Sequence, residues 1–182
     1  LAIVQLDYCE RSSAAALVLA DGSCVLVTMP AGGLAPLSEV CVARWLCGPG
    51  KRATCARIGA AMQMVAVGCE DGEVQLYSLT RSASAAPAPL PADPAAGAMA
   101  PPSGLPEPEL PVRTLSLESW GYKLHLTGCV SYVQWAPDAR AIAVGYAAHG
   151  LVVWSPSGCR LMSSLRQPRH LEGDGLVGED PG

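Results

Sequence analysis

The chain has 182 residues, of which 50% are hydrophobic and only 5% aromatic, and it carries a formal net charge of −4. Because no basic stripe is present, the sequence gives no electrostatic support for nucleic-acid binding. No apolar run reaches the ~18 residues of a membrane-spanning helix, and residues 1–7 lack the charged and apolar regions of a signal peptide.

The first 30 residues predict a strand followed by a β-hairpin. Asp21-Gly22 separates two apolar runs, and this pair is a strong hairpin signal because glycine adopts positive φ without steric cost. Residues 31–36 are rich in Gly and Pro and indicate a loop. Residues 40–46 predict another strand, and residues 54–58 predict the first strand of a second unit.

A strand–turn–strand sequence pattern occurs three times, and this repeat decides the predicted fold class. Each copy is an apolar run, a turn that ends in glycine and a second apolar run; the copies occupy residues 16–27, 64–77 and 141–154. A hairpin that buries both faces requires stacked neighbours. We therefore expect an all-β chain that forms a partial β-propeller of four-stranded blades.

The spacing of the turns supports the repeat. The turn glycines Gly22, Gly72 and Gly150 are 50 and 78 residues apart, and the longer interval contains residues 81–111, which include nine prolines. Without this stretch the interval falls to about 47 residues, close to the ~40–45 of one blade. Because proline removes ladder donors, we expect a disordered insertion there. A ligand for an SH3-type domain is an alternative interpretation of its proline-rich end.

The predicted organisation is propeller blades in residues 1–80, the disordered proline-rich insertion in 81–111, further blades in 112–166 and a disordered tail in 167–182. Within the third part, residues 123–126 predict a strand. Because the chain starts without Met and holds roughly three of the ~4–8 blades of a closed propeller, we expect a fragment of a longer protein.

Cysteine usage and motif content favour binding over catalysis. Most of the eight cysteines lie in apolar strand patterns, where a free thiol behaves as a small hydrophobic side chain. No C-x-x-C pair or histidine at ligand spacing occurs, so we expect reduced cytoplasmic thiols and no metal; disulfides are the alternative interpretation of the even count. No nucleophile elbow or phosphate-binding glycine loop is present. We therefore expect no catalytic residue and no cofactor.

The last of the three units resembles a known repeat. Residues 133–138, Val-Gln-Trp-Ala-Pro-Asp, are similar to a characteristic segment of WD repeats, and residues 151–154 resemble the strand that closes the repeat, although Ser155 stands where aspartate is usual. The resemblance implies WD-type blades, with structural roles for Trp135, Asp138, Gly145, Gly150 and Trp154. The residue types agree, because large rings pack well between blades and aspartate bonds backbone amides in turns.

A closer resemblance covers residues 115–167 and, more weakly, residues 1–80. The strings Trp-Gly-Tyr at 120–122 and Ser-Gly-Cys-Arg-Leu-Met at 157–162 resemble the N-terminal propeller of the large Ric-type subunit of the Ric–Rgp guanine-nucleotide exchange complex. The proline-rich insertion departs from that family.

This resemblance implies a non-catalytic scaffold in a complex that loads GTP onto a Golgi Rab GTPase and supports retrograde transport to the Golgi. The implied partners are a smaller Rgp-type subunit and the Rab, with no nucleic acid. The implied location is the cytoplasm, with peripheral recruitment to the Golgi membrane only through partners.

Three residues are candidates for contact with a partner. Trp120 and Tyr122 flank Gly121 at a predicted loop–strand junction, where an exposed aromatic side chain can anchor a partner. Arg160 is the third candidate, because its charge suits an acidic partner surface. Packing between blades is the alternative role for the two aromatics, and solvation is the alternative for the arginine.

Two other function classes fit the sequence. The first is a generic WD-type interaction adaptor without Rab activity. The second is an enzyme built on a propeller, which requires carboxylates such as Glu70, Asp71, Glu73 and Asp138 to converge on a common channel.

Overall fold

A computed structural model describes residues 2–29, 42–48, 50–80, 108–123, 127–148 and 150–164. Several sequence predictions fall outside these ranges. They concern the predicted loop at residues 31–36, residues 81–107 of the predicted insertion and the predicted tail.

The described strands form three antiparallel four-stranded sheets, in each of which neighbouring strands are consecutive in the chain. The first sheet contains β1 (Ile3–Cys9), β2 (Ala14–Leu19), β3 (Cys24–Thr28) and β4 (Val42–Leu46). The second contains β5 (Ala53–Gly59), β6 (Met64–Cys69), β7 (Val74–Ser78) and β8 (Arg113–Leu115). The third contains β9 (Val130–Trp135), β10 (Ile142–Tyr146), β11 (Gly150–Trp154) and β12 (Arg160–Ser163).

The all-β prediction is confirmed, and each predicted repeat is the central hairpin of one sheet: β2–β3, β6–β7 and β10–β11. The described helices are three single 3-10 turns, η1 (Glu10–Ser12), η2 (Ala60–Met62) and η3 (Glu118–Trp120). Within the described ranges, no helix has the length and apolar character needed to cross a bilayer. The described strands show three separate sheets and no closed ring.

The second sheet is assembled from both sides of the predicted insertion. Val74 and Gln75 of β7 pair with Leu115 and Thr114 of β8, so the strand after the insertion completes the second unit and does not begin the third. The end of the predicted insertion contacts the first sheet, because the Glu109 carboxylate forms an ion pair with Arg44 of β4 at 2.9 Å.

The predicted strand at residues 123–126 is wrong at its first residue. Lys123 lies in no strand, and residues 124–126 are outside the described ranges. The stretch before it is a connection that carries η3, in which Gly121 takes a φ of 80° and donates its N–H to the carbonyl of Glu118. Tight closure at Gly121 turns the chain here, so local alternation of polar and apolar residues is a poor guide to strand.

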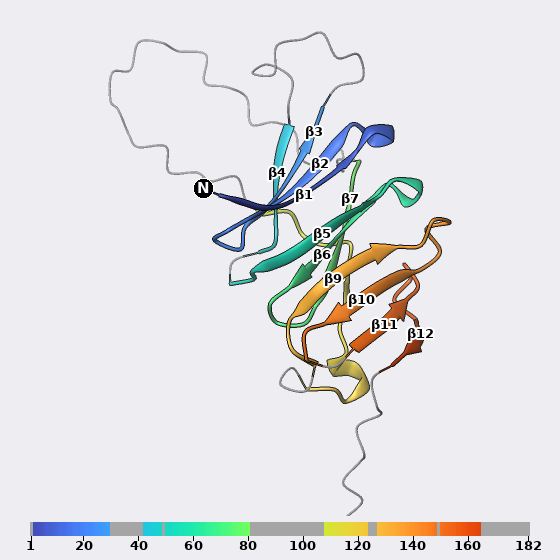
Figure 1. Ribbon diagram of the computed structural model, residues 1–182. Coiled ribbons are helices and arrows are strands. Elements are labelled where there is room, and N and C mark those ends of the chain that lie inside the picture. The colour runs from blue at the N-terminus through green and yellow to red at the C-terminus, as the bar shows by residue number, and fades with distance from the viewer. Residues whose placement is uncertain are drawn as a thin grey trace, which may run out of the picture.

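The three sheets stack face to face, with the second in the middle (Figure 1). Two apolar cores lie between them. The first core contains Ala14, Ala16, Val18, Cys24, Leu26, Leu46, Ala53, Ala56, Val65, Val67, Tyr77 and Leu79. The second contains Cys55, Ala66, Val74, Leu76, Leu115, Leu117, Tyr122, Val130, Val133, Trp135, Ala139, Ile142, Val144, Tyr146, Val152 and Trp154.

Glycines in the second sheet let the third sheet approach closely. A Cβ added at Gly59 would lie 2.6 Å from the indole ring of Trp135, and one at Gly68 would lie 2.4 Å from Cγ1 of Val130. These distances are too short for non-bonded carbon atoms, so both positions require a residue without a side chain. The large β9 side chains therefore fill the space that the glycines leave.

Polar side chains of β1 bind the free edge of β5. The Gln5 carboxamide accepts a hydrogen bond from Ala56 N at 3.0 Å. The Asp7 carboxylate accepts one from Ile58 N at 2.7 Å and another from Arg57 Nη1 at 2.7 Å. Because β5 pairs with only one strand of its own sheet, these bonds supply partners for backbone donors that would otherwise face the interface.

The third sheet binds β5 from the opposite side. Trp135 Nε1 donates a hydrogen bond to the carbonyl of Arg57 at 3.0 Å, and the Thr54 hydroxyl donates to the carbonyl of Val130 at 2.5 Å. β5 is thus bonded to β6 within its sheet and to side chains or backbone of β1 and β9 across both interfaces.

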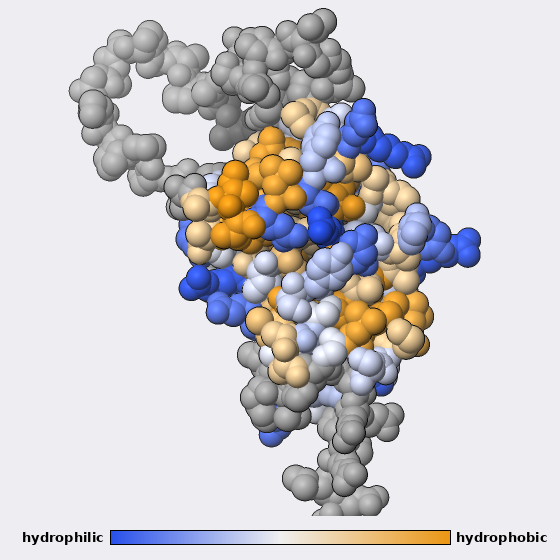
Figure 2. Space-filling view, viewed as in Figure 1, coloured by the Kyte–Doolittle hydropathy of each residue, from blue (hydrophilic) through white to orange (hydrophobic). Residues whose placement is uncertain are grey.

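The outward faces of the two end sheets are rich in apolar residues. On β1 the residues between the polar ones, including Leu6 and Tyr8, face away from the second sheet and are exposed. On the third sheet Met162 is likewise exposed, whereas the Tyr132 ring lies 5.8 Å from the guanidinium of Arg57 on β5. Figure 2 shows apolar side chains gathered over the first sheet and again over the third. Exposed apolar patches of this kind mark surfaces that contact another protein or a further part of the same protein.

We predict that Gly68→Ala destabilises the fold by about 1–3 kcal/mol, because the new methyl group overlaps Val130 and Cys55. Urea unfolding followed by tryptophan fluorescence measures this change. Gly48→Ala is the matched control, since a Cβ at Gly48 meets no atom within 4 Å. Equal effects of the two substitutions would contradict the packing described above.

We predict that Asp7→Ala lowers the free energy of unfolding by about 1–3 kcal/mol, because two donors of β5 lose their acceptor. Asp138→Ala serves as the control. Among the described residues its carboxylate accepts from Arg140 N in its own exposed turn, so we expect a loss under about 1 kcal/mol. A loss for Asp7→Ala no larger than that of the control would contradict a role in joining the sheets.

Candidate partner-binding surface

Two of the three predicted contact residues form a stacked pair, and the third lies beside them. The Arg160 guanidinium lies 4.3 Å from the ring centroid of Trp120 and 5.7 Å from that of Tyr122. Trp120 ends η3 in the connection between β8 and β9, whereas Arg160 begins the edge strand β12. The sequence separates these residues by about 40 positions, and stacking of the second and third sheets brings them together.

The three side chains differ in exposure. Trp120 is 46% exposed, whereas Tyr122 is 5% exposed and belongs to the core between the second and third sheets. Tyr122 therefore packs between two sheets, which was the alternative to a partner contact for this residue. A guanidinium over an aromatic face gains electrostatic attraction from the ring, so Arg160 fixes the orientation of the Trp120 indole at the surface.

An apolar residue of β12 extends the surface around this pair. Leu161, which follows Arg160, is exposed, whereas Met162 pairs with Val153 and lies on the other face of the sheet from Arg160, which pairs with Trp154. β12 is also the outer strand of its sheet. An exposed indole and an arginine are residue types enriched at protein–protein interfaces. We refer to Trp120, Arg160 and Leu161 as the Trp120 surface.

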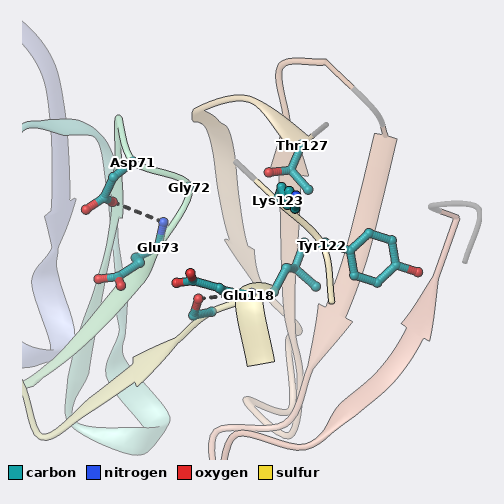
Figure 3. A pocket seen from close by; sticks show the side chains of 9 residues that line it. Asp71, Gly72, Glu73, Glu118, Tyr122, Lys123 and Thr127 are labelled. Atoms are coloured by element: carbon teal, nitrogen blue, oxygen red, sulfur yellow. Dashed lines mark hydrogen bonds between the residues drawn. The ribbon is translucent and has the colours of Figure 1, made fainter. Parts of the chain in front are cut away.

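A pocket of about 330 Å³ opens between the β6–β7 turn and the connection between β8 and β9. Its lining consists of Asp71, Gly72, Glu73, Ser116, Leu117, Glu118, Tyr122, Lys123 and Thr127. Figure 3 shows the carboxylates of Asp71, Glu73 and Glu118 on one side of the pocket, and the Tyr122 ring directed away from them. The pocket thus has an acidic wall next to the Trp120 surface.

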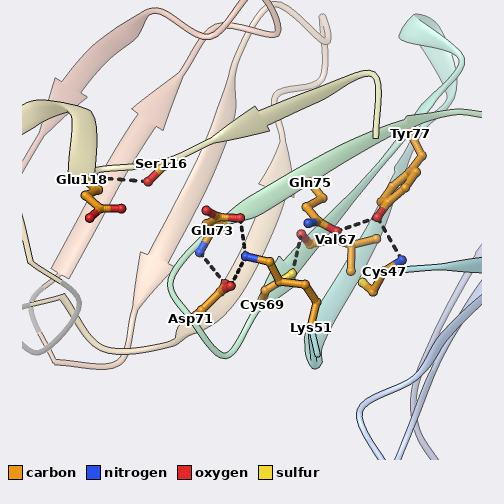
Figure 4. A network of polar contacts seen from close by, with 10 residues as sticks. All are labelled: Cys47, Lys51, Val67, Cys69, Asp71, Glu73, Gln75, Tyr77, Ser116 and Glu118. Carbon is orange, nitrogen blue, oxygen red and sulfur yellow. Dashed lines mark hydrogen bonds and ion pairs between the residues drawn. The ribbon is translucent and has the colours of Figure 1, made fainter. Parts of the chain in front are cut away.

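The acidic wall is partly neutralised by a lysine that the sequence analysis did not single out. Lys51 Nζ forms ion pairs with Asp71 and Glu73, the latter at 2.7 Å (Figure 4). Burial alone would lower the pKa of Lys51, but its hydrogen bonds to Asp71 and Glu73 outweigh burial and raise it. About 20 residues separate the partners in sequence. The contact forms because the fold brings the turns after β4 and β6 together.

A second polar network lies at the same end of the interface between the first and second sheets. The Tyr77 hydroxyl donates a hydrogen bond to Gln75 Oε1 and accepts one from Cys47 N at 2.9 Å (Figure 4). Burial raises the pKa of Tyr77, so the phenol stays protonated and keeps its donor. Tyrosine in an apolar strand gave no sequence signal for this role.

The residues assigned to the repeat occupy structural positions. Trp135 and Trp154 are buried in the second core. Asp138 Oδ1 accepts from Arg140 N at 3.0 Å, which is the turn contact expected from the sequence. Gly150 has a φ of 92°, and Gly145 lies within β10 opposite Tyr132.

Two of the four carboxylates named for a propeller enzyme share one cavity. Asp71 and Glu73 both line the pocket and pair with Lys51, whereas Glu70 pairs with Arg52 at 3.3 Å and Asp138 lies in its own turn. Among the described residues, no group of three or more His, Cys, Asp or Glu side chains is placed to bind a metal ion.

Comparison with known proteins bears out the predicted resemblance. The chain is 27% identical over 169 residues to the mouse (Mus musculus) protein named guanine nucleotide exchange factor subunit RIC1, a match that covers 90% of this chain and 10% of the mouse protein. It is 26% identical over 169 residues to the human (Homo sapiens) protein of the same name, with the same coverage. No model of a known protein family matches the chain. The chain thus spans about a tenth of the length of these relatives, is similar to them over nearly all of its own length, and resembles a Ric-type exchange factor subunit.

Proposed function

We propose that this chain is a non-catalytic, propeller-forming part of the large subunit of a guanine-nucleotide exchange complex that acts on a Golgi Rab GTPase. The observation that carries the proposal is similarity to two exchange factor subunits across 90% of the chain. In this proposal a smaller Rgp-type subunit completes the complex, which supports retrograde transport to the Golgi.

The open faces of the end sheets support the propeller part of the proposal. Each described sheet is a four-stranded meander, and adjacent sheets bury apolar faces against each other. The outward faces of β1 and of the third sheet are apolar in the same way. Further blades would cover these faces and close the ring.

Nucleotide exchange fits a chain that offers binding surfaces. An exchange factor accelerates release by binding the nucleotide-free GTPase more tightly than the nucleotide-bound form, so no covalent bond is made or broken. The proposed contribution of this chain is to hold the partners in the required orientation. The Trp120 surface is the proposed docking site, because it combines an exposed anchor with a charge-bearing neighbour.

The proposal places the protein in the cytoplasm and brings it to the Golgi membrane through its partners. A generic interaction adaptor without Rab activity is the alternative. The same stacked sheets and the same Trp120 surface suit that role, so a measurement of exchange separates the two.

We predict that the full-length protein copurifies with the smaller subunit and that the complex accelerates release of labelled GDP from a Golgi Rab above its intrinsic rate. Stopped-flow fluorescence of a labelled nucleotide measures the release. A stable complex that leaves the release rate of every Golgi Rab unchanged would favour the adaptor and contradict the exchange function.

We predict that Trp120→Ala in the full-length protein weakens binding of the smaller subunit by about 1–3 kcal/mol, because a central aromatic anchor is lost. Arg160→Lys should weaken it less, since the ammonium group stacks less well on the indole than the planar guanidinium does. Titration calorimetry measures both affinities.

The matched control is Met62→Ala, which removes an exposed apolar side chain from η2, outside the Trp120 surface. We expect unchanged affinity for this variant. Thermal unfolding of all three variants checks that the fold is retained. Unchanged affinity of Trp120→Ala would remove the Trp120 surface from the proposal.

A further inference from the structure

The two open faces of the stack are opposite halves of one kind of contact. We call the face that a sheet turns toward the next sheet in the chain its front, the other face its back, and the contact between two sheets a seam. Among the described residues, the front of the third sheet and the back of the first have no neighbouring sheet (Figure 1). The residues on these two faces repeat those that meet inside the stack.

The seam between the second and third sheets shows how a front face receives a back face. Gly68, on the front of the second sheet, leaves a socket that Val130 of the third sheet fills, because a Cβ at Gly68 would lie 2.4 Å from Val130 Cγ1. The Thr54 hydroxyl bridges the carbonyl oxygens of Gly68, 3.0 Å away, and of Val130. A glycine with a hydroxyl beside it therefore receives a β-branched side chain.

The front of the third sheet carries the same socket. Gly145 is the penultimate residue of β10, as Gly68 is of β6. The Ser131 hydroxyl donates to the carbonyl of Gly145 at 3.1 Å, as that of Thr54 does to Gly68. The three atoms nearest to a Cβ at Gly145 belong to Ser131 and Tyr132 of the same sheet, none closer than 3.4 Å. Among the described residues, no side chain of another sheet fills this socket.

The residues around the two sockets also agree. Ala66 pairs with Leu76 on the front of the second sheet, and Ala143 pairs with Val153 on the front of the third. The first pair is fully buried under the third sheet, whereas the second pair is only half-buried. The third sheet thus presents an open surface whose counterpart inside the stack is a closed seam.

The back of the first sheet carries side chains of the kind that enter a socket. β9 directs three residues into the core below it, Val130, Val133 and Trp135. Val130 pairs with the last residue of β10, and Ile3 of β1 pairs with the last residue of β2, so the two correspond. Equal spacing makes Leu6 and Tyr8 the counterparts of the other two. The three on β9 are at most 6% exposed, whereas those on β1 are 53–56% exposed.

A hydrogen-bond acceptor is also present at the required position. Asp7, on the front of the first sheet, accepts from Ile58 N of the second sheet at 2.7 Å. Gln134 occupies the corresponding position on β9, and its Oε1 accepts from the Tyr132 hydroxyl and has a second lone pair. On the back of a first sheet, the donor that corresponds to Ile58 N is Tyr8 N. The open seam therefore has its polar contact as well as its apolar ones.

We propose that the front of the third sheet binds the back of the first sheet of a second copy of this chain, so that copies join head to tail. Ile3 of one copy enters the Gly145 socket of the other. Since each copy holds three sheets, two copies hold six, within the ~4–8 blades of a closed propeller. We therefore expect a closed dimer with two identical seams. Where further blades of a longer chain cover these faces, they take the place of the second copy.

The proposal goes beyond nucleotide exchange and does not depend on it, because it concerns only the two open faces. Sedimentation velocity of the intact chain over a concentration series tests it without a variant. We expect a monomer–dimer equilibrium. A chain that sediments as a monomer at every concentration up to its solubility limit would overturn the proposal, and a ladder of larger species would overturn the closed dimer.

Two variants block the two faces separately. Gly145→Val fills the socket, yet the nearest atoms of its own sheet lie at ordinary contact distance from the new Cβ. Leu6→Glu places a charge on the back of the first sheet, where this side chain is exposed. We expect each variant to raise the dimer dissociation constant at least about tenfold. Met62→Glu, an exposed position on η2 outside both faces, should leave it unchanged.

A mixture of the two blocked variants distinguishes a head-to-tail contact from a symmetric one. Gly145→Val keeps an intact back and Leu6→Glu an intact front, so the mixture should recover a dimer with one copy of each. Circular dichroism and thermal unfolding of each variant check that the fold is retained. A dimer that Gly145→Val leaves unchanged, or a mixture of folded variants that stays monomeric, would overturn the proposal.

Discussion

The bonds made by the free edge of β5 determine how the sheets are arranged. A strand at the edge of a sheet leaves every second N–H and C=O without a partner, and burying those groups unpaired costs more free energy than a lost contact between apolar groups. Here Gln5 and Asp7 accept from β5 on one side, and Trp135 donates to it on the other. The sheets therefore stack in one register, because sliding one sheet past the next would strand these groups inside an apolar interface.

The same constraint explains where binding surfaces can exist. Sheet faces are used for stacking, so the side chains available to partners come from the turns and connections at the ends of the strands. The pocket, the Lys51 ion pairs and the Trp120 surface all include residues of such segments. Connections of this kind are positioned by a rigid scaffold yet tolerate sequence change, which is why they carry function more often than the core does.

Sequence patterns predicted the strands well and the contacts between sheets poorly. The central hairpins were predictable because their signals are local: apolar runs and turns that end in glycine act over fewer than about ten residues. The pairing of β8 with β7 was not predictable, since the proline-rich stretch separates them and local alternation does not indicate a partner strand. Trp120, Tyr122 and Arg160 were candidates by residue type alone. Only the stack shows that Arg160 lies on Trp120 while Tyr122 is buried.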